Sequence, residues 1–340
     1  MTLPSRYVPT GTVLSGGRGD VQVCTDTFLD RKVAVKSVRH GSSELRNELA
    51  TLRAVSSDHV VDIYDYVTTA SASYLVEEFL AGSDIDLSPT TDEALRVLYQ
   101  LAAGVSDIHA QGIVHGDLKP KNMRFSAAGL LKIFDFGFSR PSGHPTVGGR
   151  GTIPFMAPEL FTPGALNIDP EGDTYAFGVL AWALLDGALP ACTAKGLLAP
   201  PTPHVATMSN PDVTVEIRDL IDQCLSYAAA NRPAMLNVKS AFKRELNRSR
   251  HQSHLFYSGT PYQLDQSNRG VRIKKGSHAA TIQYVDGLRF VCTPTSGTVK
   301  VNGQPIGGAH ELPGCCLISL GDGSNALHIP FDLYEPEVQT

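Results

Sequence analysis

The sequence lacks long apolar runs, an excess of positive charge and any regular spacing of its cysteines. No stretch approaches the roughly 20 apolar residues that a membrane span needs, and the first twenty residues have neither the basic flank nor the apolar centre of a signal peptide. The six cysteines follow no disulfide or metal-binding pattern. Lys and Arg number 29 against 34 Asp and Glu, so the chain has no basic footprint for nucleic acid. We therefore expect a cytoplasmic protein with reduced thiols, no membrane insertion and no nucleic-acid partner.

The order of patterns along the chain predicts more than one folded unit. At 340 residues the chain is long for a single core, and its 42% hydrophobic and 19% charged residues are typical of a globular protein. β-rich runs with one amphipathic helix extend to about residue 80, and helical spacing dominates from there to residue 247. Residues 248–261 are polar and indicate a linker. Short alternating runs separated by glycines then predict a small all-β domain over 262–333.

The most informative segment is H-G-D-L-K-P-K-N at residues 115–122, followed by D-F-G at 135–137. Together they place an acid, a cation, an amide and a second acid in the order that phosphoryl transfer requires. V-A-V-K lies upstream at 33–36, and G-T-I-P-F-M-A-P-E lies downstream at 151–159. These motifs, in this order, resemble those of the eukaryotic-type Ser/Thr protein kinases, and the resemblance covers residues 8–247.

The resemblance implies an α+β, bilobal protein-kinase fold with ATP bound between the lobes. The β-rich N-lobe would extend over about 8–80 and the helical C-lobe over about 81–247. A glycine-rich loop would cover the phosphates, because the absence of side chains lets backbone N–H groups approach them. Lys36 would bind the α- and β-phosphates, with Glu48 as its ion-pair partner and Glu44, one turn earlier, as the alternative. The implied ATP-binding residues are Gly16, Gly17, Gly19, Val21, Ala34, Lys36, Glu48 and Glu78.

Four polar residues carry the chemistry that the resemblance implies. Asp117 would accept the proton of the substrate hydroxyl, or orient that hydroxyl toward the γ-phosphate. Lys119 would neutralise charge that develops on the transferred phosphoryl group. Asn122 and Asp135 supply hard oxygen ligands, which suit a Mg²⁺ ion shared with the phosphates. Lys119 together with Thr152 resembles the Ser/Thr-directed branch, so we expect protein Ser and Thr hydroxyls as acceptors, and autophosphorylation as well.

Three further positions match structural residues of the family. Glu159, at the end of the activation segment that also contains Thr152, and Arg232 match a buried ion pair. Asp173 matches an acid at the start of a helix that holds the backbone of the catalytic loop. An acid at that place is also a plain helix cap, so Asp173 indicates fold more than chemistry.

Several positions depart from the family's pattern. Leu14 stands where the first glycine of the glycine-rich loop is expected, and Glu77, before the hinge, would either hydrogen-bond within the pocket or face solvent. Gly116 replaces an arginine that normally pairs with a phosphorylated activation loop, so we hypothesise that loop phosphorylation is not the main switch. Arg140 or Arg150 would be suspected if that hypothesis failed. A pseudokinase scaffold and a small-molecule phosphotransferase remain the alternatives, although small-molecule kinases generally lack the activation-segment motif.

Residues 262–333 resemble a forkhead-associated (FHA) domain, a β-sandwich that binds phosphothreonine. The matches include His278, T-S-G-T at 295–298 and V-N-G at 301–303. Lys275 stands where the phosphate-binding serine is expected, so the sequence favours docking or self-association over binding of a phosphoprotein. The cations that could still pair with a phosphate are Arg272, Lys274 and Lys275.

Overall fold

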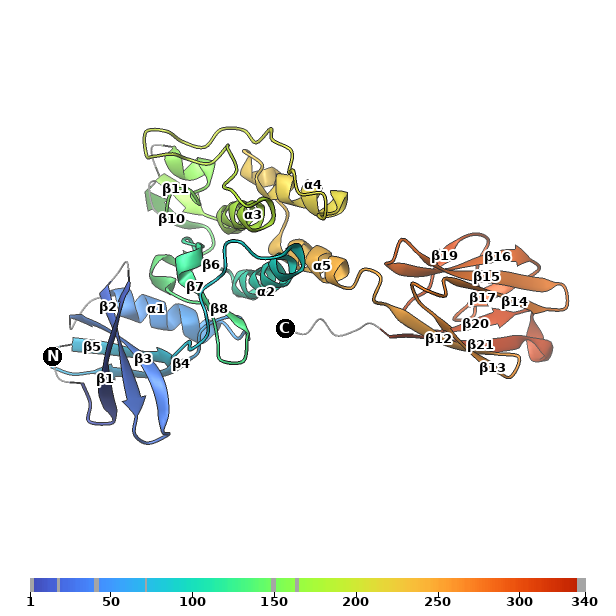
Figure 1. The fold of residues 1–340 in the computed structure, drawn as a ribbon, viewed down its shortest axis with the longest axis horizontal. Coiled ribbons are helices and arrows are strands. Elements are labelled where there is room, and N and C mark those ends of the chain that lie inside the picture. Colours follow the sequence, from blue (N-terminus) through green and yellow to red (C-terminus); the bar gives the residue numbers. More distant parts are fainter. Residues whose placement is uncertain are drawn as a thin grey trace. The chain divides into compact units, whose positions relative to one another are not determined.

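The computed structural model describes residues 3–16, 19–39, 43–70, 72–147, 151–162 and 165–334. The chain divides into two compact units, one that extends to Phe242 and one that runs from Lys243 to Gln339 (Figure 1). The first unit contains a five-stranded sheet followed by helices, and the second is built almost entirely of strands. The predicted fold class, with a β-rich part, a helical part and an all-β part in that order, is confirmed.

An antiparallel sheet with strand order β1-β2-β3-β5-β4 forms the N-terminal part of the first unit. Its elements are β1 (Tyr7–Gly16), β2 (Gly19–Asp26), β3 (Arg31–Arg39), α1 (Ser43–Ala54), β4 (Ile63–Thr68) and β5 (Ala72–Glu78). Val33 and Val35 on β3 pack with Val76 on β5 in a small apolar core. Because side chains alternate along a strand, Ala34 and Lys36 lie on the opposite face. The helix α1 packs against β4 and β5.

Helices form the rest of the first unit around a buried central helix. They are α2 (Thr91–Ala110), α3 (Pro170–Asp186), α4 (Val215–Cys224) and α5 (Met235–Leu246), and the boundary between the two units falls within the last turn of α5. A capping box begins α2, since Thr90 and Glu93 each accept a hydrogen bond from the other's backbone N–H. Helix α3 is apolar on nearly all sides and packs against α2 and α4. No helix among the described residues is long and apolar enough to cross a membrane.

Three pairs of short strands shape the segments between α2 and α3. The pairs are β6 (Ile113–Val114) with β9 (Arg140–Pro141), β7 (Met123–Phe125) with β8 (Leu131–Ile133), and β10 (His144–Val147) with β11 (Ala165–Ile168). Met123 pairs with Ile133 in the β7–β8 hairpin. This register brings the chain just before β7 next to the chain just after β8, so the motifs at 115–122 and 135–137 meet.

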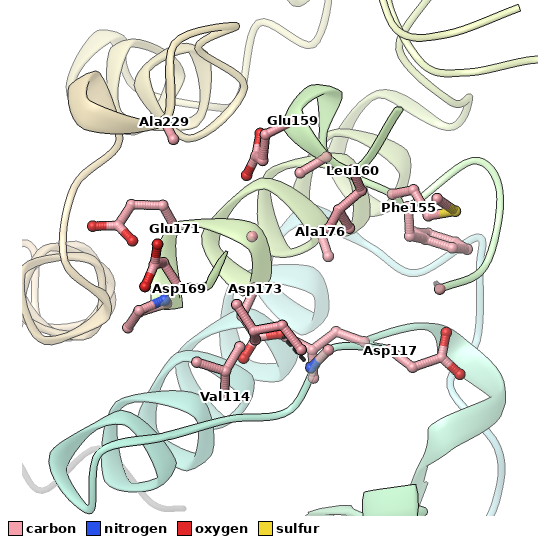
Figure 2. Close-up of a pocket in the computed structure, with 18 of the residues that line it drawn as sticks. Val114, Asp117, Phe155, Glu159, Leu160, Asp169, Glu171, Asp173, Ala176 and Ala229 are labelled. Carbon is pink, nitrogen blue, oxygen red and sulfur yellow. Dashed lines mark hydrogen bonds between the residues drawn. The ribbon is translucent and has the colours of Figure 1, made fainter. Parts of the chain in front are cut away.

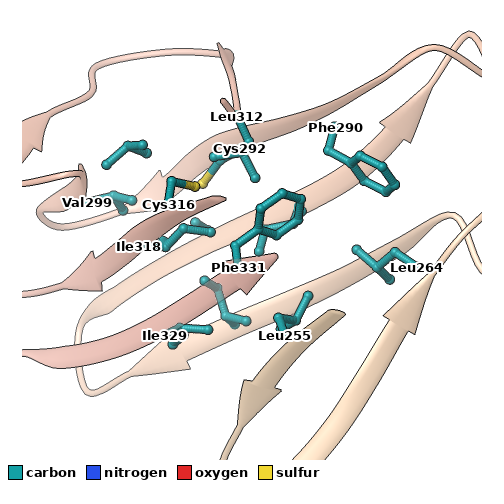
Figure 3. Packing of buried hydrophobic residues seen from close by; sticks show 14 of the residues in the cluster. Leu255, Leu264, Phe290, Cys292, Val299, Leu312, Cys316, Ile318, Ile329 and Phe331 are labelled. Atoms are coloured by element: carbon teal, nitrogen blue, oxygen red, sulfur yellow. The ribbon is translucent and has the colours of Figure 1, made fainter. Parts of the chain in front are cut away.

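The second unit is a sandwich of two antiparallel sheets around one apolar core (Figure 3). One sheet has the order β13-β12-β21-β20-β17-β18 and the other β14-β15-β16-β19. Phe290 and Cys292 from the smaller sheet pack with Ile318 and Phe331 from the larger one. The strands are β12 (Gln252–Tyr257), β13 (Thr260–Leu264), β14 (Gly270–Lys275), β15 (His278–Val285), β16 (Arg289–Ser296), β17 (Val299–Val301), β18 (Gln304–Pro305), β19 (His310–Glu311), β20 (Cys315–Leu320) and β21 (Leu327–Tyr334).

The prediction of a linker over 248–261 is wrong for most of that range. Strand β12 pairs with both β13 and β21, so it is an inner strand of the larger sheet. Ser253 and Leu255 are buried, whereas His254 and Phe256 are exposed. The segment is polar in composition because Gln252, the outward-facing His254 and the inward-facing Ser253 are polar, although Phe256 also faces outward. Its alternation of buried and exposed positions is that of a strand with one solvated face.

Candidate active site

Asp117 lies between β6 and β7 and is almost fully buried, with 4% of its surface exposed. Lys119 Nζ donates to Asp117 Oδ2 at 2.6 Å, and the Thr152 hydroxyl donates to Asp117 Oδ1 at 2.7 Å. Lys119 Nζ also lies 2.7 Å from the Thr152 hydroxyl oxygen, which closes a ring of three polar contacts. A buried charge is costly unless it is paired and hydrogen-bonded, and both carboxylate oxygens have a partner here. The structure thus brings the predicted acid, cation and threonine together.

A second buried carboxylate, Asp173 in the first turn of α3, holds the backbone of the catalytic loop, the segment at residues 115–122. It accepts hydrogen bonds from the N–H groups of His115 at 2.7 Å and Gly116 at 2.9 Å. His109 Nε2, from α2, lies 3.0 Å from Asp173 Oδ2. Burial opposes the negative charge of Asp173. The hydrogen bond and charge of His109, together with the hydrogen bond from the Gly116 N–H, outweigh burial and lower the pKa of Asp173. Gly116 has a φ of 77°, a left-handed conformation that favours glycine.

Lys36 on β3 links the sheet to α1 and to the D-F-G segment. Its Nζ lies 2.8 Å from Glu48 Oε1 and 3.1 Å from Asp135 Oδ1. Burial works against the lysine charge, but the negative charges of Glu48 and then Asp135 outweigh it and raise the pKa of Lys36. Glu48 is therefore the ion-pair partner, as the sequence predicted. The side chain of the alternative, Glu44, lies outside the described residues.

Asn122 and Asp135 come together because β7 and β8 pair. The backbone carbonyl of Asn122 accepts a hydrogen bond from the N–H of Phe134 at 3.0 Å, directly before Asp135. Asn122 Nδ2 donates to the backbone carbonyl of Asp117 at 2.9 Å, which leaves Oδ1 as the atom that would bind a cation. One amide oxygen and one carboxylate fit Mg²⁺, which takes few protein ligands and keeps water and phosphate oxygens. In the described part of the chain, no cluster of three or more His, Cys, Asp or Glu side chains forms a metal site by itself.

The glycine-rich segment lies where β1 ends and β2 begins. Gly16 pairs with Gly19 across this turn, and Gly17 lies outside the described residues. Val21 then pairs with Lys36 across β2 and β3. These pairs place Gly16 and Gly19 further along the sheet than Lys36.

Glu78, at the end of β5, is engaged in a structural ion pair. Its Oε2 lies 3.2 Å from Lys132 Nζ. Lys132 on β8 is buried and also donates to the backbone carbonyl of Val60 at 3.2 Å. Any contact of Glu78 with a nucleotide would therefore come from its backbone. Sequence reasoning missed Lys132, whose signal was a lysine inside the apolar run L-L-K-I at 130–133.

Glu77 is buried, with 8% of its surface exposed, so the solvent-facing alternative is wrong. It pairs with Ala34 across β3 and β5. Its Oε1 atom is buried and has no hydrogen-bond partner among the described residues. Burial, followed by the negative charge of Glu48, raises the pKa of Glu77 to about 8, although Lys36 opposes this shift.

The activation segment is tied to the helical part by a buried arginine. Arg232 Nη1 lies 2.7 Å from Glu159 Oε1, and Nη2 lies 2.8 Å from Oε2, so the ion pair is bidentate. Arg232 also donates to the backbone carbonyls of Ser226 and Glu171 at 2.9 Å each. The predicted pair of Glu159 and Arg232 is present, and the arginine side chain is 0% exposed.

A cavity of about 850 Å³ lies beside Asp117, between the catalytic loop, the activation segment and the start of α3 (Figure 2). Thr152, Phe155, Leu160 and Asp169 line it together with Asp117. No Lys or Arg is among its described lining residues. Asp117 and Thr152 both line the cavity, so a molecule bound there would lie against them.

The comparisons with known proteins agree with this geometry. The protein kinase domain family matches residues 7–242. The chain is 32% identical to "Serine/threonine-protein kinases drp72" of Corynebacterium efficiens, over 52% of this chain and 38% of that protein. It is 34% identical to "Serine/threonine-protein kinase pkn2" of Myxococcus xanthus, over 56% of this chain and 25% of that protein. With "Serine/threonine-protein kinase PknL" of Mycobacterium tuberculosis, identity is 31% over 55% of this chain and 51% of the relative.

The chain therefore belongs to the protein kinase family. Protein kinase domains generally use ATP and Mg²⁺ and act on protein substrates. The aligned segments span between about a quarter and about half of the length of these three relatives.

Proposed function

We propose that the chain is an active Ser/Thr protein kinase, which transfers the γ-phosphate of ATP to Ser and Thr hydroxyls of proteins and of itself. The observation that carries this proposal is the closed ring of contacts among Asp117, Lys119 and Thr152. The ring orients the acid, and it places a cation and the activation segment beside it before any substrate is bound. A scaffold without activity would have no need of this arrangement.

Each side chain has a defined role in the proposed reaction. Asp117 orients the acceptor hydroxyl and takes its proton, and Lys119 stabilises negative charge that develops on the transferred group. Lys36, held by its carboxylate partner on α1, binds the α- and β-phosphates. Asn122 and Asp135 would hold Mg²⁺, which supplies positive charge that neutralises the phosphate oxygens. Catalysis is then mainly positioning and electrostatic stabilisation, since a loose phosphoryl transition state needs little covalent help.

Incubation with γ-labelled ATP and Mg²⁺, followed by identification of the labelled amino acids, tests this function. The acceptors are the chain itself and a generic basic protein. Label on Ser or Thr is the expected result. Transfer only to small hydroxyl compounds would favour a small-molecule phosphotransferase, and tight ATP binding without transfer would favour a scaffold.

We further propose that phosphorylation of the activation loop is not the main switch. Gly116 offers no cation to a loop phosphate, and β10 pairs with β11 through the backbone. The Thr152 hydroxyl contacts Asp117 directly. Of the two arginines that would substitute, Arg140 donates to the carbonyl of Ser139 at 2.6 Å, and Arg150 lies outside the described residues.

Phosphatase treatment is therefore expected to change kcat by well under tenfold. A tenfold change would correspond to about 1.4 kcal/mol of transition-state stabilisation. Intact mass measurement before and after treatment confirms that phosphate was removed. Loss of activity that autophosphorylation then restores would contradict the proposal.

For the second unit we propose an FHA-like sandwich that serves docking or self-association. Support comes from the two packed sheets and from the hydrogen bond of 2.8 Å that His278 Nδ1 accepts from the Thr298 N–H, which joins two of the matched segments. Lys275, at the place of the expected serine, donates to the backbone carbonyl of Asn325. The position of the phosphate-binding hydroxyl is thus filled by a cation with a backbone partner.

We expect phosphorylation of threonine in a peptide to increase its affinity for the full chain by less than about tenfold. This corresponds to a difference in binding free energy under about 1.4 kcal/mol. Titration calorimetry with matched phosphothreonine, phosphoserine and unmodified peptides measures this ratio. Tight binding that is selective for phosphothreonine would overturn the docking proposal.

A further inference from the structure

We propose that the outer face of the larger sheet in the second unit binds the same face of a second copy of this chain. The outer face consists of the residues of β12, β21 and β20 that point away from the apolar core. The inference rests on the proposed role of this unit in docking or self-association, and it names the surface and the partner.

Large apolar side chains are exposed on this face. In the described part of the second unit three of them are exposed, Phe256 at 55%, Leu317 at 41% and Tyr334 at 59%. They belong to β12, β20 and β21, which are neighbours in the larger sheet (Figure 1). Residues next to them in sequence, such as Leu255 and Ile318, are buried in the core, so by alternation the exposed ones share the outer face. A contiguous apolar patch of this kind marks an interaction site.

The strand register brings apolar residues of three strands into one row. Leu317 pairs with Pro330 across β20 and β21. Leu255 pairs with Phe331 across β12 and β21, so Phe256 and Pro330 occupy the next positions on these two strands. Pro330 is exposed as well. The row of Phe256, Pro330 and Leu317 therefore crosses the middle of the face without a polar residue.

Other surfaces of the sandwich are poorly suited to apolar association. The two edge strands of the larger sheet, β13 and β18, contain Pro261 and Pro305. Proline has no N–H to donate, so it opposes the addition of a further strand at an edge. On the smaller sheet Arg272, Lys274 and Arg289 are exposed, and their charges favour contact with water. A partner is thus expected on the outer face of the larger sheet.

The charges on this face indicate that the partner is a second copy. Asp332 is the only Asp, Glu, Lys or Arg in β12, β20 and β21, which the structure describes completely. A strongly charged partner would gain little from such a face, whereas an equally apolar and uncharged surface would match it. The same face of another copy has that chemistry.

The single acid of the face is also compatible with twofold symmetry. Asp332 pairs with His254 across β21 and β12. In a twofold contact, if one residue touches a second on the partner, the second touches the first on the other side. Asp332 of each copy can therefore lie against His254 of the partner subunit, which keeps the two carboxylates apart.

Sedimentation of the full chain at increasing concentration tests the proposal, with wild type, Leu317→Lys and Leu198→Lys compared. We expect the wild type to dimerise below about 100 μM. Leu317→Lys places an ammonium group in the apolar row of both copies, so it should raise the dissociation constant of the dimer by about a hundredfold or more. Leu198→Lys is the matched control, because it makes the same change at a fully exposed leucine of the first unit. It should leave the dissociation constant unchanged.

Cys315 provides a second measurement that needs no variant. It pairs with Asp332 across β20 and β21, and of the six cysteines, all of which the structure describes, it alone is exposed. Its reaction with iodoacetamide, followed by mass spectrometry, should slow as the concentration of wild type rises through the dissociation constant of the dimer. The result decides the question even if Leu317→Lys does not fold.

A wild type that stays monomeric at about 100 μM would overturn the inference. Slow labelling of Cys315 in such a monomer would show that another part of the same chain covers the face, which also contradicts it. A dimer that Leu317→Lys leaves at wild-type affinity would contradict this surface but not self-association. Tight, selective binding of phosphothreonine peptides, measured separately by calorimetry, would contradict the proposed docking role but not the dimer.

Discussion

Replacement of Asp117 by Asn should lower kcat by about 10²- to 10⁴-fold, the contribution that a positioned general base makes. The amide has nearly the shape of the carboxylate, but it cannot take a proton at neutral pH and carries no charge beside Lys119. The Lys36 ion pair does not include Asp117, so ATP binding should change little. Steady-state phosphate transfer together with a separate measurement of ATP affinity distinguishes the two effects.

Asp92→Asn is the matched control, because Asp92 is an exposed carboxylate on α2 whose salt bridge with Arg96 is solvent-accessible. It should leave kcat unchanged, since exposed pairs contribute little. An Asp117→Asn variant that kept more than about a tenth of wild-type kcat would show that another group performs the base chemistry.

Replacement of Arg232 by Met should lower the free energy of unfolding of the kinase unit by about 3 kcal/mol, the lower end of the cost of removing one partner from a buried ion pair, because the Glu159 side chain is 31% exposed. The variant would leave Glu159 without its bidentate partner and the carbonyls of Ser226 and Glu171 without a donor. Trp182 is the only tryptophan in the chain and is buried in α3 of this unit. Its fluorescence during urea unfolding therefore reports on the kinase unit and not on the sandwich.

Arg96→Met serves as the comparison for this experiment. Arg96 pairs with Asp92 on the exposed surface of α2, with 37% of its side chain accessible. Its loss should cost less than about 1 kcal/mol. If both arginine variants unfolded at the same urea concentration, the bidentate pair would not be the anchor of the activation segment.

Much of the site could be predicted from the sequence because its chemistry is local. Asp117, Lys119 and Asn122 fall within one short segment, so their order alone limits how they can meet. The ion pair of Lys36 with Glu48 was expected from the resemblance to protein kinases. Helix periodicity put Glu48 near the face that packs on the sheet, but it left Glu44, one turn earlier, as an alternative. The fold class followed from the change of apolar period, from alternation to helical spacing and back.

What the sequence could not settle depended on contacts between distant segments. The direction of the Glu77 side chain follows from the β3–β5 register and from burial beside α1, which no local pattern encodes. The engagement of Glu78 by Lys132 and of Asp173 by His109 likewise requires elements far apart in sequence. Strand β12 was missed because composition was given more weight than alternation.

The most direct measurement is phosphate transfer from γ-labelled ATP with Mg²⁺ by wild type and Asp135→Asn, with ATP affinity measured for both. We expect label on Ser or Thr in the wild type, dependence on Mg²⁺, and loss of transfer in Asp135→Asn, which removes the carboxylate ligand. Tight ATP binding by the wild type without any transfer, or equal transfer by the variant, would contradict the assignment of these residues to a working kinase.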